Sequence, residues 1–564
     1  MISYQKKRLG DILIESGKLT EDRLKEALLI QKQVGKRLGE ILVEQNFVTE
    51  EDIIEVLEKQ LNIERVNLEI IRIDRRAIKM ISENVCRKHL IVPYEIDDNN
   101  NTIKVAMADP LDIVAIDDVE ISTGLNVRPY IAVKQSIQRA IDIYYSNQKV
   151  LSAAEELTKE VDEGNNLILD NIEEVDNLDN APIIKMIEYV MKNAVEERAS
   201  DIHIESYENI LRIRYRIDGK LHTISTLPVD TLAPLVTRIK ILANLDISEK
   251  RLPQDGRILT RFGDKQIDLR VSILPMITGE KIVIRIINKE NFIISKEGLG
   301  IKDYELNLLE KITKHSNGII LVTGPTGSGK TTTLYTILNE LNTDSKNIIT
   351  IEDPVEVSIE GINQVNVNNK VGLTFATGLR SILRQDPDII MIGEIRDSET
   401  AQIAIRSAIT GHLVLSTLHT NNAPSSILRL EDMGVQRYLI ANAIKGVIAQ
   451  RLVRKICPKC KLQYDATPYE KEILNIDKNE ELILHKGKGC AYCNNTGYVG
   501  RMGIYEIMEV TKEHREAILE NKSADILKEI SIKNGMRTLG QACRSLVLEG
   551  NTTVEEMLNI TYDM

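Results

Sequence analysis

The chain has 564 residues, 43% of them hydrophobic and 28% charged, which is typical of globular protein and too long for one hydrophobic core. Its formal net charge of −12 argues against a track for nucleic acid and against binding an anionic bilayer by charge alone. No apolar run approaches a membrane span and no signal-peptide core begins the chain, so we expect a cytoplasmic protein that reaches a membrane only through partners.

Residues 1–62 contain a repeat that predicts two similar helical units. The first copy begins Arg8-Leu9-Gly10 and runs to Gln31, and the second begins Arg37-Leu38-Gly39 and runs to Gln60. Asn46 and Ile53 of the second copy replace glycine and leucine of the first. Core packing explains the leucines at helical spacing but not arginine and glutamine at matched positions. Arginine can bond guanine through two hydrogen bonds, and glycine lets a backbone approach a ligand.

Three segments of different composition follow the repeat. Residues 63–148 combine strand-like runs with a helical one and predict a small α/β unit, and residues 149–180 have the acidic composition of a linker. Residues 181–296 predict an α+β domain from a helical run followed by alternating strands. This domain is rich in arginines, among them Arg257 and Arg270. They can equally line a solvated strand face or pair with Asp218, Asp255 or Asp268.

The most informative segment is 318–333, GIILVTGPTGSGKTTT, in which an apolar strand leads through a glycine-rich turn into a helix-forming run. The turn matches G-x-x-x-x-G-K-[ST], whose inward N–H groups and following helix N-terminus bind phosphates. We expect Lys330 to reach the β- and γ-phosphates and the Thr331 hydroxyl to hold Mg²⁺. The residues predicted to surround the nucleotide are Gly324, Pro325, Thr326, Gly327, Ser328, Gly329, Lys330, Thr331 and Thr332.

Three further segments supply polar groups at strand ends. An apolar strand ends at Gly393-Glu394, with glycine where a Walker B aspartate usually stands. We expect this strand to lie beside the apolar strand that leads into the glycine-rich turn, which we call the P-loop. Acids at 352, 353 and 356 follow another short strand. His412 and His419 flank a third. Taken singly, each has an ordinary structural explanation, because strand ends are often solvated and most histidines are structural.

Four of the six cysteines form two C-x-x-C pairs, Cys457 with Cys460 and Cys490 with Cys493. Two such pairs suit a tetrahedral zinc ion held by four thiolates, which is a structural site. A redox-active C-x-x-C motif is the alternative, and the presence of two C-x-x-C pairs disfavours it. The remaining cysteines, Cys86 and Cys543, are expected to be buried. We assign 457–493 to this insertion and 494–564 to a C-terminal helical region.

The run 318–421 resembles the ATPases of type II secretion and type IV pilus assembly, and the likeness extends over nearly the whole chain. It implies an α/β multidomain protein with a RecA-like ATPase core at 297–456, α+β N-terminal domains, a PAS-like domain at 181–296 and a zinc insertion. In that family Glu394 would polarise the attacking water, Glu352 would help hold Mg²⁺, and His412 and His419 would sense the γ-phosphate. Arg257 and Arg270 would act as arginine fingers on a neighbouring subunit.

The 24-residue repeat motif resembles the cyclic-di-GMP-binding domain of some extension ATPases. Together these resemblances imply a homo-hexameric, Mg²⁺-dependent ATPase that powers pilus extension through an inner-membrane platform protein of the PilC or GspF kind. A type II secretion or DNA-uptake motor is the nearest alternative. A signalling scaffold without turnover is disfavoured by Lys330 and Glu394. A helicase is disfavoured by the acidic charge and the 4% aromatic content.

Overall fold

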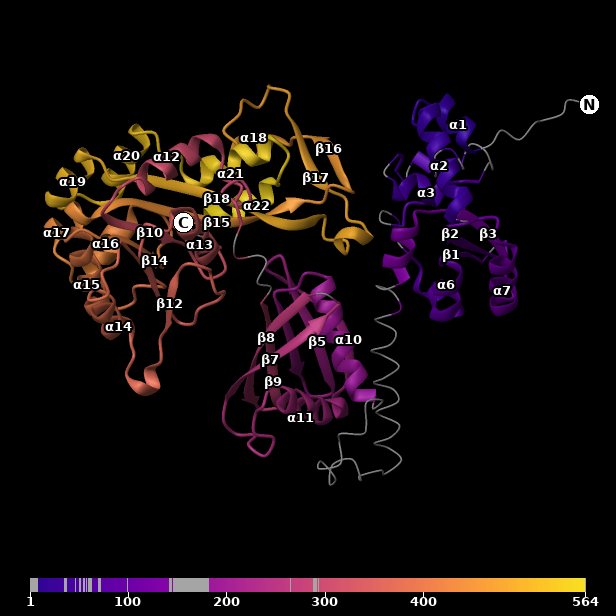
Figure 1. The fold of residues 1–564 in the computed structure, drawn as a ribbon, viewed down its shortest axis with the longest axis horizontal. Helices are drawn as coiled ribbons and strands as arrows, with labels where there is room; N and C mark the ends of the chain where they lie inside the picture. The colour runs from indigo at the N-terminus through magenta and orange to yellow at the C-terminus, as the bar shows by residue number, and fades with distance from the viewer. Residues whose placement is uncertain are drawn as a thin grey trace, which may run out of the picture.

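The structure is a computed structural model that describes residues 9–34, 38–45, 47–49, 63–68, 73–98, 100–141, 182–263, 265–287 and 294–562, with positions 52, 53, 56, 58, 71, 145 and 292. Helices and strands are mixed along the chain, which confirms the predicted α/β multidomain class (Figure 1). The predicted linker at 149–180 and the motif residues Arg8, Arg37 and Gln60 lie outside the described residues. Among the described helices, none has the length and apolar character that crossing a bilayer requires.

The N-terminal repeat forms one small core from helices α1 (Leu9–Glu15), α2 (Glu21–Val34) and α3 (Leu38–Glu44). Its buried side chains are related by the sequence repeat: Leu13 and Leu42, Leu19 and Val48, and Ala27 and Val56. The main chain repeats as well, because the nitrogen of residue 19 donates to the carbonyl of residue 13 and that of residue 48 to the carbonyl of residue 42. The two copies therefore fold alike and share one core.

The next unit is a three-stranded sheet with helices packed around it, and residues 134–141 are also helical. Its elements are α5 (Arg75–Met80), α6 (Glu83–His89), β1 (Ile91–Asp97), β2 (Thr102–Met107), α7 (Ile113–Thr123) and β3 (Asn126–Ile131). Strand β2 is central, antiparallel to β1 and parallel to β3. Side-chain caps at Ser82 and Asp112 begin α6 and α7. Cys86 is buried in this core, as predicted.

Residues 182–287 form the middle domain, a six-stranded antiparallel sheet covered by two helices. The elements are α10 (Pro182–Glu196), β4 (Asp201–Ser206), β5 (Ile210–Ile217), β6 (Lys220–Pro228), α11 (Leu232–Leu242), β7 (Gln254–Phe262), β8 (Lys265–Met276) and β9 (Gly279–Ile287). The strand order is β6-β5-β4-β9-β8-β7. Strand β5 alternates buried Leu211, Ile213 and Tyr215 with arginines, so one sheet face packs on the helices and the other is charged.

The C-terminal half is built on a seven-stranded sheet of order β12-β11-β13-β14-β10-β15-β18. Its strands are β10 (Gly318–Thr323), β11 (Ile348–Glu352), β12 (Asn363–Asn366), β13 (Ile389–Ile392), β14 (Leu413–Leu418), β15 (Ile444–Ile456) and β18 (Tyr498–Glu509). All neighbours are parallel except β15 and β18. Strands β10, β13 and β14 are buried throughout, as expected for parallel strands covered on both faces.

The helices around this sheet are α12 (Asp303–Thr313), α13 (Lys330–Leu341), α14 (Phe375–Ile382), α15 (Ser398–Ile409), α16 (Ser425–Asp432) and α17 (Arg437–Ala443). The C-terminal region, yellow in Figure 1, adds α19 (Lys512–Leu519), α20 (Ala524–Lys533), α21 (Leu539–Leu548) and α22 (Val554–Tyr562). Between β15 and β18 the insertion forms a hairpin of β16 (Lys461–Asp465) and β17 (Ile483–Gly487) around α18 (Pro468–Ile473).

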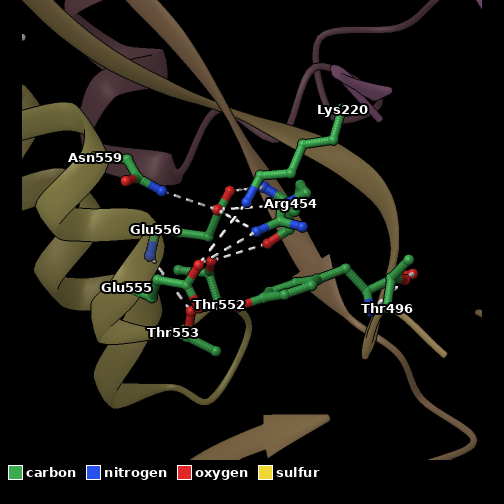
Figure 2. A network of polar contacts seen from close by, with 9 residues as sticks. Lys220, Arg454, Thr496, Thr552, Thr553, Glu555, Glu556 and Asn559 are labelled. Atoms are coloured by element: carbon green, nitrogen blue, oxygen red, sulfur yellow. Dashed lines mark hydrogen bonds and ion pairs between the residues drawn. The ribbon is translucent and has the colours of Figure 1, made fainter. Parts of the chain in front are cut away.

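Helix α22 is fixed to the sheet by a buried ion pair, shown in Figure 2. The Arg454 guanidinium of β15 lies 2.8 Å from Glu556 Oε1, and the Arg454 main-chain nitrogen donates to the other oxygen at 2.9 Å. Burial alone would raise the pKa of Glu556, but these bonds hold it below its ordinary value. At the edge of this network Lys220 of β6 lies 3.8 Å from Glu555, which links the middle domain to the C-terminal helix.

Candidate nucleotide and metal sites

The P-loop connects β10 to α13, and the residues predicted to surround the nucleotide lie on this loop and the first turn of the helix. Gly324 has a φ of 149°, and a Cβ there would lie 2.5 Å from the carbonyl oxygen of Gln450, so no side chain fits. The Lys330 ammonium donates to the carbonyls of Gly324 and Pro325 at 2.9 and 3.0 Å. Burial lowers its pKa to about 8, and the charge of Glu394 opposes that shift.

Glu394 follows β13 at the same edge of the sheet as the P-loop. Its Oε2 lies 2.7 Å from Arg396 Nε and 3.5 Å from His419 Nε2, and its side chain is 15% exposed. The strand order differs from the expectation, because β14 separates β13 from the P-loop strand β10. His419 follows that intervening strand, which explains why it reaches Glu394. The structure thus brings Lys330, Glu394 and His419 together.

Gly393 stands where many P-loop proteins have an aspartate, and packing explains the glycine. A Cβ at this position would lie 3.3 Å from Glu352 Cα and 3.4 Å from the Ile351 carbonyl oxygen, because β11 and β13 are neighbours. A side chain at this position would require these neighbours to shift by a few tenths of an ångström. The strand end therefore offers its carboxylate one residue later, at Glu394.

Glu352 ends β11 and is 3% exposed. Its carboxylate accepts hydrogen bonds from Tyr335, Thr350 and Gln364. Burial raises the pKa of this carboxyl. Of the other two acids of this segment, which we call the acid box (352–356), Asp353 is exposed and Glu356 half-buried.

His412 occupies the opposite end of the sheet from His419. It precedes β14, its main-chain carbonyl accepts from Gly318 at the start of β10, and its ring Nδ1 lies 3.0 Å from the Ser407 carbonyl. Seven residue-to-residue steps of about 3.3 Å along the strand separate the two histidines by about 23 Å. The expectation that both sense one γ-phosphate is therefore wrong within a single chain, because they flank the strand at its two ends.

The charged face of the middle domain carries a row of arginines. Arg257 lies opposite Arg270 in the β7–β8 register, and Arg270 lies opposite Arg285 in the β8–β9 register. Arg257 forms two hydrogen bonds to buried Asp268, at 2.7 and 2.6 Å. Arg270 lies 2.7 Å from Glu356. Within its own chain Arg270 thus contacts the acid box, and its predicted contact with a neighbouring subunit stays a prediction.

The four cysteines of the C-x-x-C pairs come together, and all are buried and free of disulfides. Their sulfur atoms lie 3.8 Å apart for Cys457 and Cys490, 3.9 Å for Cys460 and Cys493, and 3.6 Å for Cys490 and Cys493. Four thiolates about 2.3 Å from one zinc ion would be about 3.8 Å apart. The main-chain nitrogens of Cys490 and Gly497 donate to Cys493 Sγ, as suits a thiolate. The donor set fits zinc.

The cysteine cluster also touches both preceding units. Asn494 donates to Glu197 at the end of α10 at 2.7 Å, and the Arg139 guanidinium lies 4.6 Å from the centre of the Tyr492 ring. The main-chain nitrogen of Gly500 donates to Asp218 of the β5–β6 turn at 2.7 Å. A cavity of about 410 Å³ lies at this junction. The second cysteine pair and the start of β18 therefore lie where the small α/β unit, the middle domain and the large sheet meet.

In the repeat, the described motif residues lie on the three helices. Leu9 and Gly10 begin α1, and Leu38 and Gly39 begin α3. A Cβ at Gly10 would lie 2.7 Å from Leu24 Cδ1, so α1 packs closely against this leucine of α2. Gln31 lies on α2 and is half-buried. The arginines and the second glutamine of the motif lie outside the described residues.

Two polar residues of the nucleotide site were missed from the sequence. Gln450 of β15 donates from Nε2 to the Ser328 carbonyl of the P-loop at 2.7 Å while fully buried. Tyr335 of α13 donates to Glu352. Neither belongs to a recognisable motif, and Gln450 lies far from the loop in sequence, so only the strand order reveals its contact.

Known proteins are similar to this chain over nearly its whole length. A family model described as "Type II/IV secretion system protein" matches residues 176–559, and one described as "MshEN domain" matches residues 61–151. The chain is 39% identical to the type IV pilus assembly ATPase PilB of Myxococcus xanthus, covering 98% of this chain and 99% of that protein. It is 44% identical to type II secretion system protein E of Xanthomonas campestris, covering 83% and 82%.

Among solved structures, the Yersinia pseudotuberculosis ATPase DotB shares the fold with a TM-score of 0.51 at 22% identity, covering 67% of this chain and 94% of that one. With the P-loop, the terminal glutamate and the four-cysteine cluster, these matches confirm the resemblance found in the sequence. The chain belongs to the type II/IV secretion system protein family, as an ATP-hydrolysing enzyme of its pilus-assembly and type II secretion branch.

Proposed function

We propose that this chain is a homo-hexameric, Mg²⁺-dependent ATPase that drives type IV pilus extension through an inner-membrane platform protein and responds to cyclic-di-GMP. The observation that carries the ATPase site is the meeting of Lys330, Glu394 and His419 at one edge of the large sheet. Pilus assembly is favoured over type II secretion because the match to a pilus ATPase runs end to end, whereas the match to a secretion ATPase covers 83% of the chain.

In this proposal the P-loop N–H groups and Lys330 bind the phosphates of ATP, and the Thr331 hydroxyl holds Mg²⁺. Glu352 lies next to Gly393 on the neighbouring strand, and its carboxylate helps to hold Mg²⁺ and the waters of the ion. Mg²⁺ would neutralise charge that develops on the phosphate oxygens. Glu394 orients and polarises the attacking water, and His419, 3.5 Å from that carboxylate, responds to the γ-phosphate.

The arginine row of the middle domain supplies positive charge to the same site. In the proposed hexamer Arg257 and Arg270 reach the nucleotide held by a neighbouring subunit, whereas within this chain Arg270 pairs with Glu356 and Arg257 with Asp268. Guanidinium groups stabilise charge in the transition state of phosphoryl transfer. Breaking the Arg270–Glu356 pair would release Arg270 for the nucleotide.

Cyclic-di-GMP binding rests on the duplicated arginine and glutamine positions and on the two-fold core that the repeat builds. The MshEN model matches the following unit, 61–151, so the two segments together are the proposed ligand-responsive region. A symmetric dinucleotide suits two equivalent half-sites.

Calorimetric titration of the full-length protein with cyclic-di-GMP, followed by ATPase assays, tests the regulatory part of the proposal. We expect saturable micromolar binding that raises the rate of phosphate release, and an affinity about 5- to 150-fold weaker in Arg8→Ala, because a bidentate base contact is worth about 1–3 kcal/mol. Lys25→Ala, an exposed residue of α2 outside the motif, should bind like wild type. Failure of the wild-type protein to bind would remove the regulatory part and leave the ATPase site untouched.

A further inference from the structure

The buried carboxylate of Glu352 is held by neutral groups. Its Oε1 accepts from Thr350 Oγ1 at 2.6 Å and from Gln364 Nε2 at 3.2 Å, and its Oε2 accepts from the Tyr335 hydroxyl at 2.5 Å. A buried carboxylate is costly unless its lone pairs are satisfied. These three donors therefore decide where the two carboxylate oxygens lie.

Tyr335 differs from the other two donors because it lies on the P-loop helix. It comes five residues after Lys330 on α13 and its side chain is fully buried. Its hydroxyl also accepts a hydrogen bond from the main-chain nitrogen of Glu356 at 3.3 Å. The bond that it donates to Glu352 and the bond that it accepts from Glu356 together fix the orientation of the hydroxyl. A displacement of α13 therefore moves the donor that sets Glu352 Oε2.

A single residue, Glu356, connects the Tyr335 hydroxyl to the middle domain. Glu356, whose nitrogen it accepts, holds the Arg270 guanidinium with its side chain at 2.7 and 3.4 Å. The contacts run from Arg270 on β8 through Glu356 to Tyr335 on α13 and then to Glu352 on β11. The Tyr335 hydroxyl therefore contacts β11 and the acid box directly, and reaches the middle domain through Glu356.

We propose that Tyr335 is a positioning residue for ATP hydrolysis, whose hydroxyl fixes the Glu352 carboxylate relative to the P-loop helix. The inference rests on the proposed role of Glu352 in holding Mg²⁺ and its waters. With the hydroxyl bond intact, Glu352 keeps one orientation as the middle domain approaches and leaves. Simple core filling is the alternative, and it requires only the ring, which phenylalanine would supply.

Tyr335→Phe in the full-length enzyme separates these two roles. We expect kcat to fall about tenfold, the effect of losing one hydrogen bond to a charged group, with KM for ATP within twofold of wild type. The Mg²⁺ concentration for half-maximal rate should rise several-fold. Tyr215→Phe is the matched control, because it removes a buried hydroxyl that donates to the Val190 carbonyl of the middle domain at 2.6 Å. It should leave kcat and the Mg²⁺ requirement unchanged.

Glu352→Gln and the double variant complete the test. If Tyr335 acts through Glu352, kcat of the double variant should equal that of Glu352→Gln within twofold, because the two losses are not additive. Additive losses, or a wild-type kcat and Mg²⁺ requirement in Tyr335→Phe beside a slow Glu352→Gln, would overturn the inference while leaving the role of Glu352 intact. A wild-type rate in Glu352→Gln would overturn that role, and the inference with it.

Discussion

Glu394→Gln should lower kcat for ATP hydrolysis by at least about a hundredfold while leaving the affinity for ATP within a few-fold of wild type. The amide keeps the size of the side chain but cannot accept a proton from water or carry the negative charge that polarises it. The P-loop and Lys330 remain, so binding should persist. Steady-state phosphate release and titration with a fluorescent ATP analogue measure the two quantities separately.

Glu399→Gln is the matched control for this variant. Glu399 is an exposed residue of α15, five positions further along the chain, and pairs with Arg380 at the surface. Its loss should leave kcat within twofold of wild type, since isolated surface pairs contribute little. A Glu394→Gln enzyme that retains more than a third of the wild-type kcat would show that another group polarises the water.

Cys490→Ser should abolish stoichiometric zinc binding and destabilise the insertion. The wild-type protein is expected to contain one zinc ion per chain, because four buried sulfur atoms lie at the spacing of a tetrahedral site. Structural zinc contributes folding energy directly, so losing a ligand exposes the hairpin of β16 and β17 to unfolding. Metal analysis and limited proteolysis within 457–493 measure the effect, and a chelator should reproduce it in the wild-type protein.

Because the insertion contacts Glu197 and Arg139, we also expect the zinc-free protein to lose the contacts that join the three units. Cys543→Ser is the control, since it makes the same chemical change at a fully buried cysteine outside the cluster. It should retain one zinc ion. Equal zinc content and equal protease resistance in the two variants would contradict a structural zinc site.

Features fixed by short stretches of sequence were predictable. The P-loop needs glycines at set positions between a strand and a helix, and its conformation follows from them. The two cysteine pairs were predictable for a similar reason, because the C-x-x-C spacing places two sulfur atoms on one turn. The repeat could be recognised because equivalent core positions, such as Leu13 and Leu42, recur at a constant interval.

Features that depend on strand order were not predictable. The position of β14 between β13 and β10 brings His419 to Glu394. Tyr335 and Gln450 read as ordinary residues of a helix and a buried strand, and only tertiary contacts place their polar groups at Glu352 and the P-loop. The acidic partner of each arginine also depends on tertiary structure. Arg270 of the middle domain pairs with Glu356 of the C-terminal half because these two parts of the chain are in contact.

The central claim is that hydrolysis at the Lys330–Glu394 site powers pilus assembly, and its most direct test is made in the native host. The measurement is the number of surface pili on cells in which Glu394→Gln replaces the wild-type protein at equal abundance. We predict cells without pili and with an unchanged profile of secreted proteins. Wild-type piliation in these cells, or lost secretion with pili intact, would contradict the claim.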